Sequence, residues 1–401
     1  MQIEIMIKEL GEIITGNTPS KKKQEFWKSK DIFFVKPDSI PDNGVNIIRD
    51  SNEYISEEAR EKARIASQNS IFVTCIGSIG KIGIAAEGEF AFNQQINVVV
   101  PNKNINAKYL AYNLLFNKSR LMKIANAPVV PIINKSQFGE FTVKIESDIK
   151  KQTEIVYVLD KISNIVKHRM NELEMLDNLI KARFVEMFGD AVDNPMRWNK
   201  KQLQEIVTDD CTISYGIVQT GEDQKDGVPV FRPVDIVNRI PKLEELKKTT
   251  EKISNKYKKT ILKGREMLIT VRANIAETCI VGEEFKGCNV GRGIVPIRTK
   301  EDIMVLEFLK YILDSKHIND DIKRKAKGIT LIQLNMQDLR EIELIIPPIE
   351  KQKAYVQFAK QVDKSKVISD TQLKNIAILL TICSTIYINM NGKMGRVLYD
   401  N

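Results

Sequence analysis

The feature that most constrains this chain is that its sequence repeats itself once. Four segments recur in the same order, the first three at an offset of 196 residues and the last at an offset of 200. They are residues 35–40 with 231–236, residues 71–74 with 267–270, Asn93 with Asn289, and residues 149–152 with 349–352. An ordered series of this kind indicates two copies of one unit, each of nearly 200 residues.

The first part of each copy has the pattern of a mixed fold. Short runs of β-branched and aromatic residues, separated by glycines, predict strands, and a longer stretch with helical periodicity follows them. The first copy should have strands at 32–35, 71–76 and 96–100 and a helix at 107–125; the second should have strands at 228–231, 267–271 and 293–297 and a helix at 305–326. This part is therefore predicted to be α+β.

The second part of each copy is predicted to be one long helix with an apolar seam. In the first copy neither Pro nor Gly interrupts residues 151–188, and Gly189 with Pro195 ends the helix. Core-facing positions alternate steps of four and three residues, which is a heptad pattern, and two such helices should pack on each other or on a partner helix. The seam positions are Ile155, Leu159, Ile162, Val166, Arg169, Leu173, Leu176 and Ile180, and then Tyr355, Ala359, Val362, Lys366, Ser369, Leu373, Ile376 and Leu380.

Together these parts predict an α+β fold with two globular α/β domains in tandem, separated by two long helices. The expected boundaries are residues 1–150 and 191–348 for the globular domains, 151–190 and 349–388 for the helices, and 389–401 for an unassigned tail. About 38 helical residues at ~1.5 Å each span roughly 57 Å, or about 17 base pairs of duplex DNA. That length predicts two separate contact regions, with unread DNA between them.

Composition indicates a globular protein whose charge suits a polyanionic partner but does not identify one. Lys and Arg outnumber Asp and Glu by 61 to 52, a net charge of +9. The N-terminus lacks the features of a secretory signal, and the apolar run at 376–388 is shorter than the ~20 residues of a membrane span. The five cysteines are dispersed, which suits a reducing compartment. We expect a cytoplasmic protein without membrane contact.

Motifs that would indicate catalysis are weak. Asn194-Pro195-Met196-Arg197 lacks the second proline and the aromatic residue of the tetrapeptide with which methyltransferases hold a target base. Residues 77–81 resemble a phosphate-binding loop, but they are too short and are followed by Ile82 where Ser or Thr is required, so a β-turn is expected. With only two histidines and no repeated acidic constellation, we predict no catalytic residue, no metal site and no cofactor in this chain.

Basic and amide side chains occur at matching places in the two copies. Clustered lysines and arginines position a protein on DNA phosphates, whereas base reading needs planar or bidentate hydrogen-bonding groups. For any one of them, the alternative is a solvated surface or a turn hydrogen bond. The copies differ most at these polar loop positions, as expected if one scaffold reads two sequences. The candidate DNA-binding residues are Lys21, Lys22, Lys23, Lys36, Ser78, Lys81, Asn93, Gln94 and Gln95, and then Gln219, Arg232, Arg272, Asn274, Asn289, Arg292, Lys325 and Lys327.

The duplicated order of these motifs resembles the specificity (S) subunit of Type I restriction–modification systems over about residues 5 to 385. The resemblance is carried in the first copy by residues 16–19 (GNTP), 35–37 (VKP), 77–80 (GSIG), 93–95 (NQQ), 151–152 (KQ) and 188–190 (FGD). Residues 193–198 resemble the linker between the repeats of that family. In the second copy it is carried by residues 227–232 (GVPVFR) and 346–352 (IPPIEKQ).

The resemblance implies a function and a set of partners. Each α+β unit would be a target-recognition domain that reads one half of a bipartite site in double-stranded DNA. The two helices would be spacers, packed antiparallel as a coiled coil, that dock two methyltransferase (M) subunits. Those subunits would carry S-adenosylmethionine and methylate adenine, and a restriction (R) subunit could join for cleavage. This chain would contribute specificity to defence against foreign DNA and would have no catalytic site.

Two other interpretations remain open at this stage. An enzyme with a cryptic nuclease or transferase site should show activity as a purified chain given metal or methyl donor. A coiled-coil scaffold that binds only proteins should show little salt-dependent affinity for DNA, whereas the affinity of a specificity subunit should fall steeply with salt.

Overall fold

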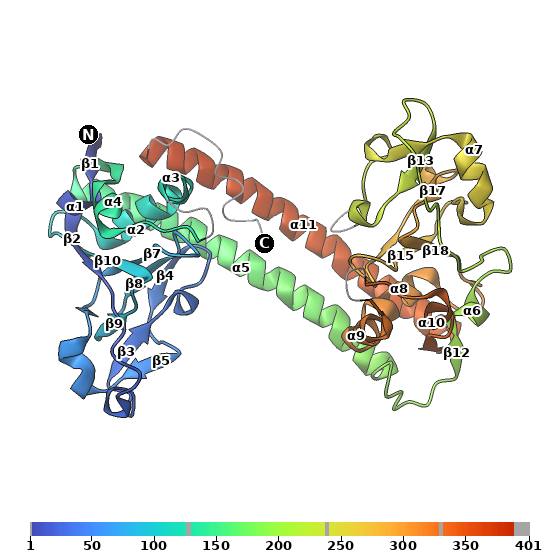
Figure 1. Cartoon of the computed structure of the whole chain (residues 1–401), viewed down its shortest axis with the longest axis horizontal. Helices are drawn as coiled ribbons and strands as arrows, with labels where there is room; N and C mark the ends of the chain where they lie inside the picture. The colour runs from blue at the N-terminus through green and yellow to red at the C-terminus, as the bar shows by residue number, and fades with distance from the viewer. Residues whose placement is uncertain (1, 126–129, 237–239, 329–331, 389–401) are drawn as a thin grey trace. The chain divides into compact units, whose positions relative to one another are not determined.

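The computed structural model describes residues 2–125, 130–236, 240–328 and 332–388, and divides into two compact units. Among the described residues, unit 1 lies within 2–172 and 368–388, and unit 2 lies within 173–367. Two long helices, α5 (Ile149–Phe188) and α11 (Ile349–Ile388), each contribute one half to each unit (Figure 1). The predicted tail at 389–401 lies outside the described residues.

The described part of unit 1 contains two large sheets and one two-stranded sheet. A five-stranded sheet has the order β2-β10-β7-β8-β4, and a four-stranded sheet has the order β5-β3-β9-β6. The residues of β7 and β8 are buried along their whole length, which explains why these strands are apolar runs without alternation. The strands are β2 (Gly11–Thr15), β3 (Ile32–Val35), β4 (Val45–Ile48), β5 (Glu53–Ile55), β6 (Ile65–Ala66), β7 (Ile71–Thr74), β8 (Ile82–Ala85), β9 (Phe90–Phe92) and β10 (Ile96–Pro101).

Helices close the other side of unit 1. Helix α2 (Ala107–Phe116) packs on β4 and β8, and the Asn106 side chain caps it by accepting from the amides of Lys108 and Tyr109. The predicted helix at 107–125 is instead two helices, because Asn117 ends α2 and begins α3 (Lys118–Ile124). The remaining elements are α4 (Lys135–Glu140), β1 (Gln2–Met6), which pairs with β11 (Thr142–Glu146), and the single turn α1 (Ile7–Leu10).

Unit 2 repeats this plan with shorter sheets, which have the orders β12-β19, β14-β13-β17 and β16-β15-β18. The predicted helix at 305–326 is likewise divided, at Ser315. The strands are β12 (Lys200–Gln202), β13 (Val228–Phe231), β14 (Lys247–Thr249), β15 (Met267–Thr270), β16 (Thr278–Ile280), β17 (Asn289–Val290), β18 (Ile294–Ile297) and β19 (Glu343–Ile345), and the helices are α6 (Leu203–Ile206), α7 (Glu251–Ser254), α8 (Leu306–Asp314), α9 (Lys316–Lys325) and α10 (Met336–Arg340).

The register of the repeat differs from the prediction at one place. The amide of Asn93 donates to Val35 O in unit 1, and the amide of Gly291 donates to Phe231 O in unit 2. Because Val35 and Phe231 are equivalent, Asn93 corresponds to Gly291, and the predicted match of Asn93 with Asn289 is wrong. The connection from β15 to β17 is two residues longer than its counterpart in unit 1. Gln94 therefore corresponds to Arg292.

The starts of both long helices are fixed by a buried glutamine. Gln152 accepts from the amide of Asn106 at 2.8 Å and donates to Glu146 O at 2.7 Å. Gln352 accepts from the amide of Val305 at 3.0 Å and donates to Pro347 O at 2.8 Å. Both side chains are 0% exposed, so each joins the first turn of its helix to backbone groups that would otherwise be buried without partners.

The two helices run in opposite directions within each unit, which confirms the predicted α+β architecture with an antiparallel helix pair. In unit 1, Ile155 and Leu159 at the start of α5 share a core with Leu380 near the end of α11. In unit 2, the hydroxyl of Tyr355 near the start of α11 donates to Ile180 O near the end of α5, at 3.3 Å. Gly189 ends α5 with a φ of +76°, a conformation that glycine adopts without strain.

In each unit an ion pair joins the globular part to the first half of a long helix, α5 in unit 1 and α11 in unit 2. The positions of the acid and the base are reversed between the two units. In unit 1, Lys108 of α2 contacts Asp160 of α5 at 2.7 Å. In unit 2, Glu307 of α8 contacts Lys360 of α11 at 2.7 Å. Their places in α2 and α8, and in α5 and α11, are equivalent, so the acid and the base have exchanged sides between the copies.

The predicted seam residues occupy the interfaces of the helices with their units. Nine of the sixteen predicted seam positions are buried, namely Ile155, Leu159, Ile180, Tyr355, Ala359, Val362, Ser369, Leu373 and Leu380. The other seven are half-buried, namely Ile162, Val166, Arg169, Leu173, Leu176, Lys366 and Ile376. The polar position Lys366 contacts Asp177 at 2.6 Å and Asp363 at 3.4 Å. Across the described residues, no helix combines the length and apolarity that a membrane span requires.

Candidate nucleic-acid interface

One tight turn recurs at the end of β7 and of β15. In unit 1 the Thr74 hydroxyl accepts from the amide of Lys81 at 3.0 Å, and the carbonyl of Thr74 accepts from the amide of Gly80 at 2.9 Å. In unit 2 the Thr270 hydroxyl accepts from Glu277 at 2.9 Å, and its carbonyl accepts from Ala276 at 2.9 Å. The resemblance of residues 77–81 to a phosphate-binding loop thus arises from a turn that both copies share.

The backbone of this turn has the same unusual dihedrals in both units. Positive φ occurs at Gly77 and Gly80 in unit 1, at +75° and +80°, and at Ala273 and Ala276 in unit 2, at +60° and +66°. Alanine at such positions costs about 1–2 kcal/mol relative to glycine. The turn leaves the predicted residues Ser78 and Asn274 exposed at equivalent positions.

A second loop lies beside this turn, immediately before β10 and β18. The amide of Cys75 donates to Gln95 O at 2.8 Å, and the amide of Val271 donates to Gly293 O at 2.8 Å. Gln94 and Arg292 are exposed at equivalent positions of this loop. We call the turn and this loop together the reading loops, residues 76–80 with 93–95 and 272–276 with 291–293. The same scaffold thus presents an amide in one copy and a guanidinium in the other.

Two of the predicted asparagines, Asn93 and Asn289, are internal, unlike the exposed Asn274. Asn93 is 6% exposed, donates to Gln95 Oε1 at 2.8 Å and accepts from the Gln95 amide at 3.1 Å, so it shapes the loop. Asn289 is 0% exposed and bonds Thr260 at 2.7 Å and Ser254 at 3.0 Å. This burial argues against the predicted base contacts of Asn93 and Asn289, since their polar atoms serve turns and strand packing.

Several predicted phosphate contacts are already paired within the protein. Lys36 forms an ion pair with Glu53, and this contact lowers the pKa of the Glu53 carboxyl and raises that of Lys36. Lys81 contacts Asp42 at 3.2 Å with a largely buried side chain, and Arg232 holds Asp235 at 2.7 Å. These three lysine and arginine side chains therefore stabilise their own loops.

Other predicted basic side chains are accessible. Lys21, Lys22 and Lys23 are exposed on the segment before β3, where Lys21 lies 5.4 Å from the Trp27 ring. In unit 2, Gln219 and Lys327 are exposed, and the half-exposed Lys325 contacts Asp321 at 3.1 Å. Ion pairs of this exposed kind are weak, so these residues remain able to contact phosphates.

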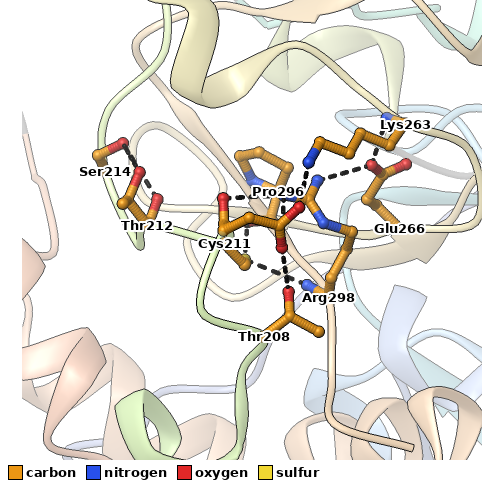
Figure 2. A network of polar contacts seen from close by, with 9 residues as sticks. Thr208, Cys211, Thr212, Ser214, Lys263, Glu266, Pro296 and Arg298 are labelled. Atoms are coloured by element: carbon orange, nitrogen blue, oxygen red, sulfur yellow. Dashed lines mark hydrogen bonds and ion pairs between the residues drawn. The ribbon is translucent and has the colours of Figure 1, made fainter.

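A buried ion pair in unit 2 has no counterpart in unit 1. Glu266 is 0% exposed and accepts from Arg298 at 2.9 Å, and Arg298 also donates to the carbonyl of Asp210 at 3.1 Å (Figure 2). Lys263 and Arg298 lower the pKa of the Asp210 carboxyl well below its usual value. The strand registers place Ser70 and Val100 at the positions of Glu266 and Arg298. Sequence reasoning missed this pair, because nothing in the local pattern marks Glu266 as buried.

One protein-family model matches both copies of the repeat. A model described as Type I restriction modification DNA specificity domain matches residues 4–175 and again residues 195–377. The chain belongs to this family. It carries two copies of the domain, one for each copy of the repeat.

Named relatives agree with this assignment. The chain is 23% identical over 405 aligned positions to the Type I restriction enzyme MjaIX specificity subunit of Methanocaldococcus jannaschii, covering 90% of this chain and 88% of that protein. It is 24% identical over 263 positions to the EcoBI specificity subunit of Escherichia coli, covering 64% of this chain and 55% of that protein. The match thus spans about half the length of the EcoBI subunit and most of the MjaIX subunit.

Two solved structures have the same fold as this member of the Type I specificity family. A Type I restriction–modification S subunit from M. genitalium superposes with a TM-score of 0.56 at 14% identity, over 98% of this chain and 97% of that chain. A second chain, from a study of complex assembly and conformational transition of a Type I system, gives a TM-score of 0.57 at 16% identity over 96% of both chains.

Proposed function

We propose that this chain reads a bipartite DNA sequence, one part with the reading loops of each unit. The observation that carries the proposal is the pair of reading loops, in which one backbone geometry presents Ser78 and Gln94 in unit 1 and Asn274 and Arg292 in unit 2. A backbone shared by the two units that carries different hydrogen-bonding groups is what two unlike half-sites require. The candidate base contacts are therefore exposed loop residues, and the candidate phosphate contacts are the accessible lysines.

The proposed protein partners are inferred from the exposed surface of the long helices and from the family to which the chain belongs. We propose residues 1–150 and 191–348 as target-recognition domains and residues 151–190 and 349–388 as spacers, in a cytoplasmic complex. The helices dock two methyltransferase subunits, which bind S-adenosylmethionine and methylate adenine, and a restriction subunit joins for cleavage. Exposed apolar side chains on α5, including Tyr157 at 61% and Met175 at 70%, support docking on these helices. The chain itself performs no catalysis in this proposal.

A modified-base map of the host genome tests the function directly. With the gene present, methyladenine should mark one motif made of two short defined parts around a fixed unread spacer. Deletion of the gene should remove that mark and no other. A map that is the same with and without the gene would contradict the proposal.

A protein-binding scaffold is the second candidate, because the same exposed apolar side chains on α5 would serve it equally. The two candidates differ in the assembled complex. A scaffold predicts DNA affinity that is the same with or without this chain, whereas a specificity subunit predicts affinity that requires it and falls steeply with salt.

A further inference from the structure

In both units a segment before α4 or α10 pairs with the second residue after β7 or β15. In unit 1, Ile132 forms an isolated antiparallel bridge with Ile76, and in unit 2, Gln333 forms one with Arg272. The flanking backbone bonds also correspond, from the Ile133 amide to Cys75 O at 2.8 Å and from the Leu334 amide to Val271 O at 2.9 Å. We call Ile76–Ile132 and Arg272–Gln333 the bridge pairs. The two bridge pairs occupy equivalent positions, but the side chains are apolar in unit 1 and polar in unit 2.

The bridge pairs lie within the proposed reading surface. The backbone of Cys75 donates to Gln95 on one side and accepts from Ile133 on the other, so the chain that leads into Ile76 has the 93–95 loop on one side and the segment of Ile132 on the other. Val271 is placed in the same way between Gly293 and Leu334. The exposed turn residues Ser78 and Asn274 follow two positions later. A base that meets the reading loops would therefore also meet the bridge pair.

The Arg272–Gln333 pair presents hydrogen-bond donors. A terminal guanidinium nitrogen of Arg272 donates to Gln333 Oε1. Because arginine cannot accept a hydrogen bond, this contact fixes the glutamine amide with its NH₂ group directed away. Among the described residues, Gln333 is the one side-chain partner of Arg272. The Nε of Arg272 is buried without a partner, so the donors left for a base are those of the terminal guanidinium nitrogens. Guanine offers two acceptors, N7 and O6, at its major-groove edge, whereas adenine offers one acceptor and one donor.

The Ile76–Ile132 pair presents apolar surface. Ile132 is 39% exposed and Ile76 is half-buried. The neighbouring Val130 is 45% exposed, so the apolar surface extends beyond the pair. In the major groove the apolar group that distinguishes one base is the methyl group of thymine.

We propose that the bridge pair is a base-selecting position in each unit, with Arg272 and Gln333 selecting guanine and Ile76 and Ile132 selecting thymine. The inference rests on the proposed function and deepens it. Of these four residues, only Arg272 is a DNA-binding candidate on the sequence alone. A structural role is the competing explanation, and it predicts loss of stability without any change in base choice.

The test uses the complete complex of this chain with its methyltransferase subunits. Methylation rates are measured on duplexes that carry each of the four bases at each position of both half-sites. Arg272→Met keeps the length of the side chain and removes its donors. We expect the preference for guanine at one position of one half-site to fall about tenfold to 100-fold, while the other half-site is read as before. Arg324→Met, which removes an exposed arginine from α9 of the same unit, should retain every base preference.

Two further variants keep the test informative if Arg272→Met folds poorly. Gln333→Glu keeps an acceptor for Arg272 but replaces the NH₂ donors of the glutamine amide by a carboxylate oxygen, which accepts. The methylation rate on duplexes with guanine at that position should therefore fall. Ile132→Ala should reduce the preference for thymine in the other half-site by roughly tenfold, whereas Met122→Ala, at a 57% exposed apolar residue of α3, should not. Thermal unfolding and assembly of each variant are measured alongside.

The possible results distinguish a failure of the bridge-pair inference from a failure of the proposed function. A wild-type complex without any bipartite motif would overturn the proposed function itself. A bipartite motif whose base preferences survive Arg272→Met and Gln333→Glu would overturn the bridge-pair inference and leave the function intact. A half-site for unit 2 that contains no guanine would do the same.

Discussion

At the scale of single residues, one exposed side chain in each reading loop is expected to control one half-site. Gln94 and Arg292 hold equivalent positions on loops with the same backbone bonds. Gln94→Ala should relax base choice in the half-site of unit 1, and Arg292→Ala in that of unit 2, each by ~1–3 kcal/mol, because each removes a contact to a base edge. The base preference of each half-site is measured by methylation of duplexes with single-base changes. An equal loss of preference in both half-sites from either variant would show that the assignment is mistaken.

A second prediction at this scale concerns the buried ion pair of unit 2. Glu266→Gln removes the buried one of the two carboxylates that pair with Arg298, whose side chain is 13% exposed, and leaves only Asp210 at 3.6 Å. It should lower the free energy of unfolding by about 3 kcal/mol. The residues of unit 1 at these positions suggest the control. Glu266→Ser combined with Arg298→Val removes both charges and should recover most of the loss. Thermal unfolding of the full chain distinguishes them; a double variant less stable than the single one would contradict this account.

At the scale of elements, the start of each long helix depends on its buried glutamine. Gln352→Leu should leave the amide of Val305 and the carbonyl of Pro347 without their partner and cost ~1–3 kcal/mol of stability. Gln361→Leu, at an exposed position of the same helix, serves as the control. Denaturant unfolding of the full chain measures both variants, and equal stabilities would mean that the glutamine has no such role.

The pairing of the helices yields a further prediction. Leu173→Asp with Leu176→Asp places charge at half-buried seam positions of α5 and should separate the helices, so that the methyltransferase subunits no longer assemble. Asn178→Asp introduces a charge at an exposed position of the same helix and should leave assembly unchanged. A sizing column reports the result, and an intact complex of the double variant would refute it.

The elements also show how far the sequence determines the fold. The strand predicted at residues 32–35, the strand predicted at 228–231 and the helix predicted at 349–388 match β3, β13 and α11, because period and caps are local properties. The register of Asn289 was wrong, since a connection two residues longer in unit 2 shifts every later residue without changing the local pattern. The burial of Glu266 and the pairing of Arg272 with Gln333 depend on segments distant in sequence, so no local pattern could indicate them.

At the scale of the whole molecule, DNA affinity should depend on salt through the accessible lysines. Binding of the complex to its site should weaken with salt, with a slope reduced by roughly three when Lys21, Lys22 and Lys23 are all replaced by Ala, because each phosphate contact releases about one counterion. Base preference should stay the same, since phosphate contacts carry no direct sequence information. A slope that does not change would mean that these lysines lie away from DNA.

The exchanged ion pairs bear on how a duplicated chain avoids misassembly. Two similar units, each with its own helix, could in principle trade helices during folding or between neighbouring chains. If α2 met α11, Lys108 would face Lys360, and if α8 met α5, Glu307 would face Asp160. Like charges at a close contact disfavour both exchanges. The reversed polarity of the two ion pairs therefore favours the pairing of each globular part with its own helix over the exchanged pairing.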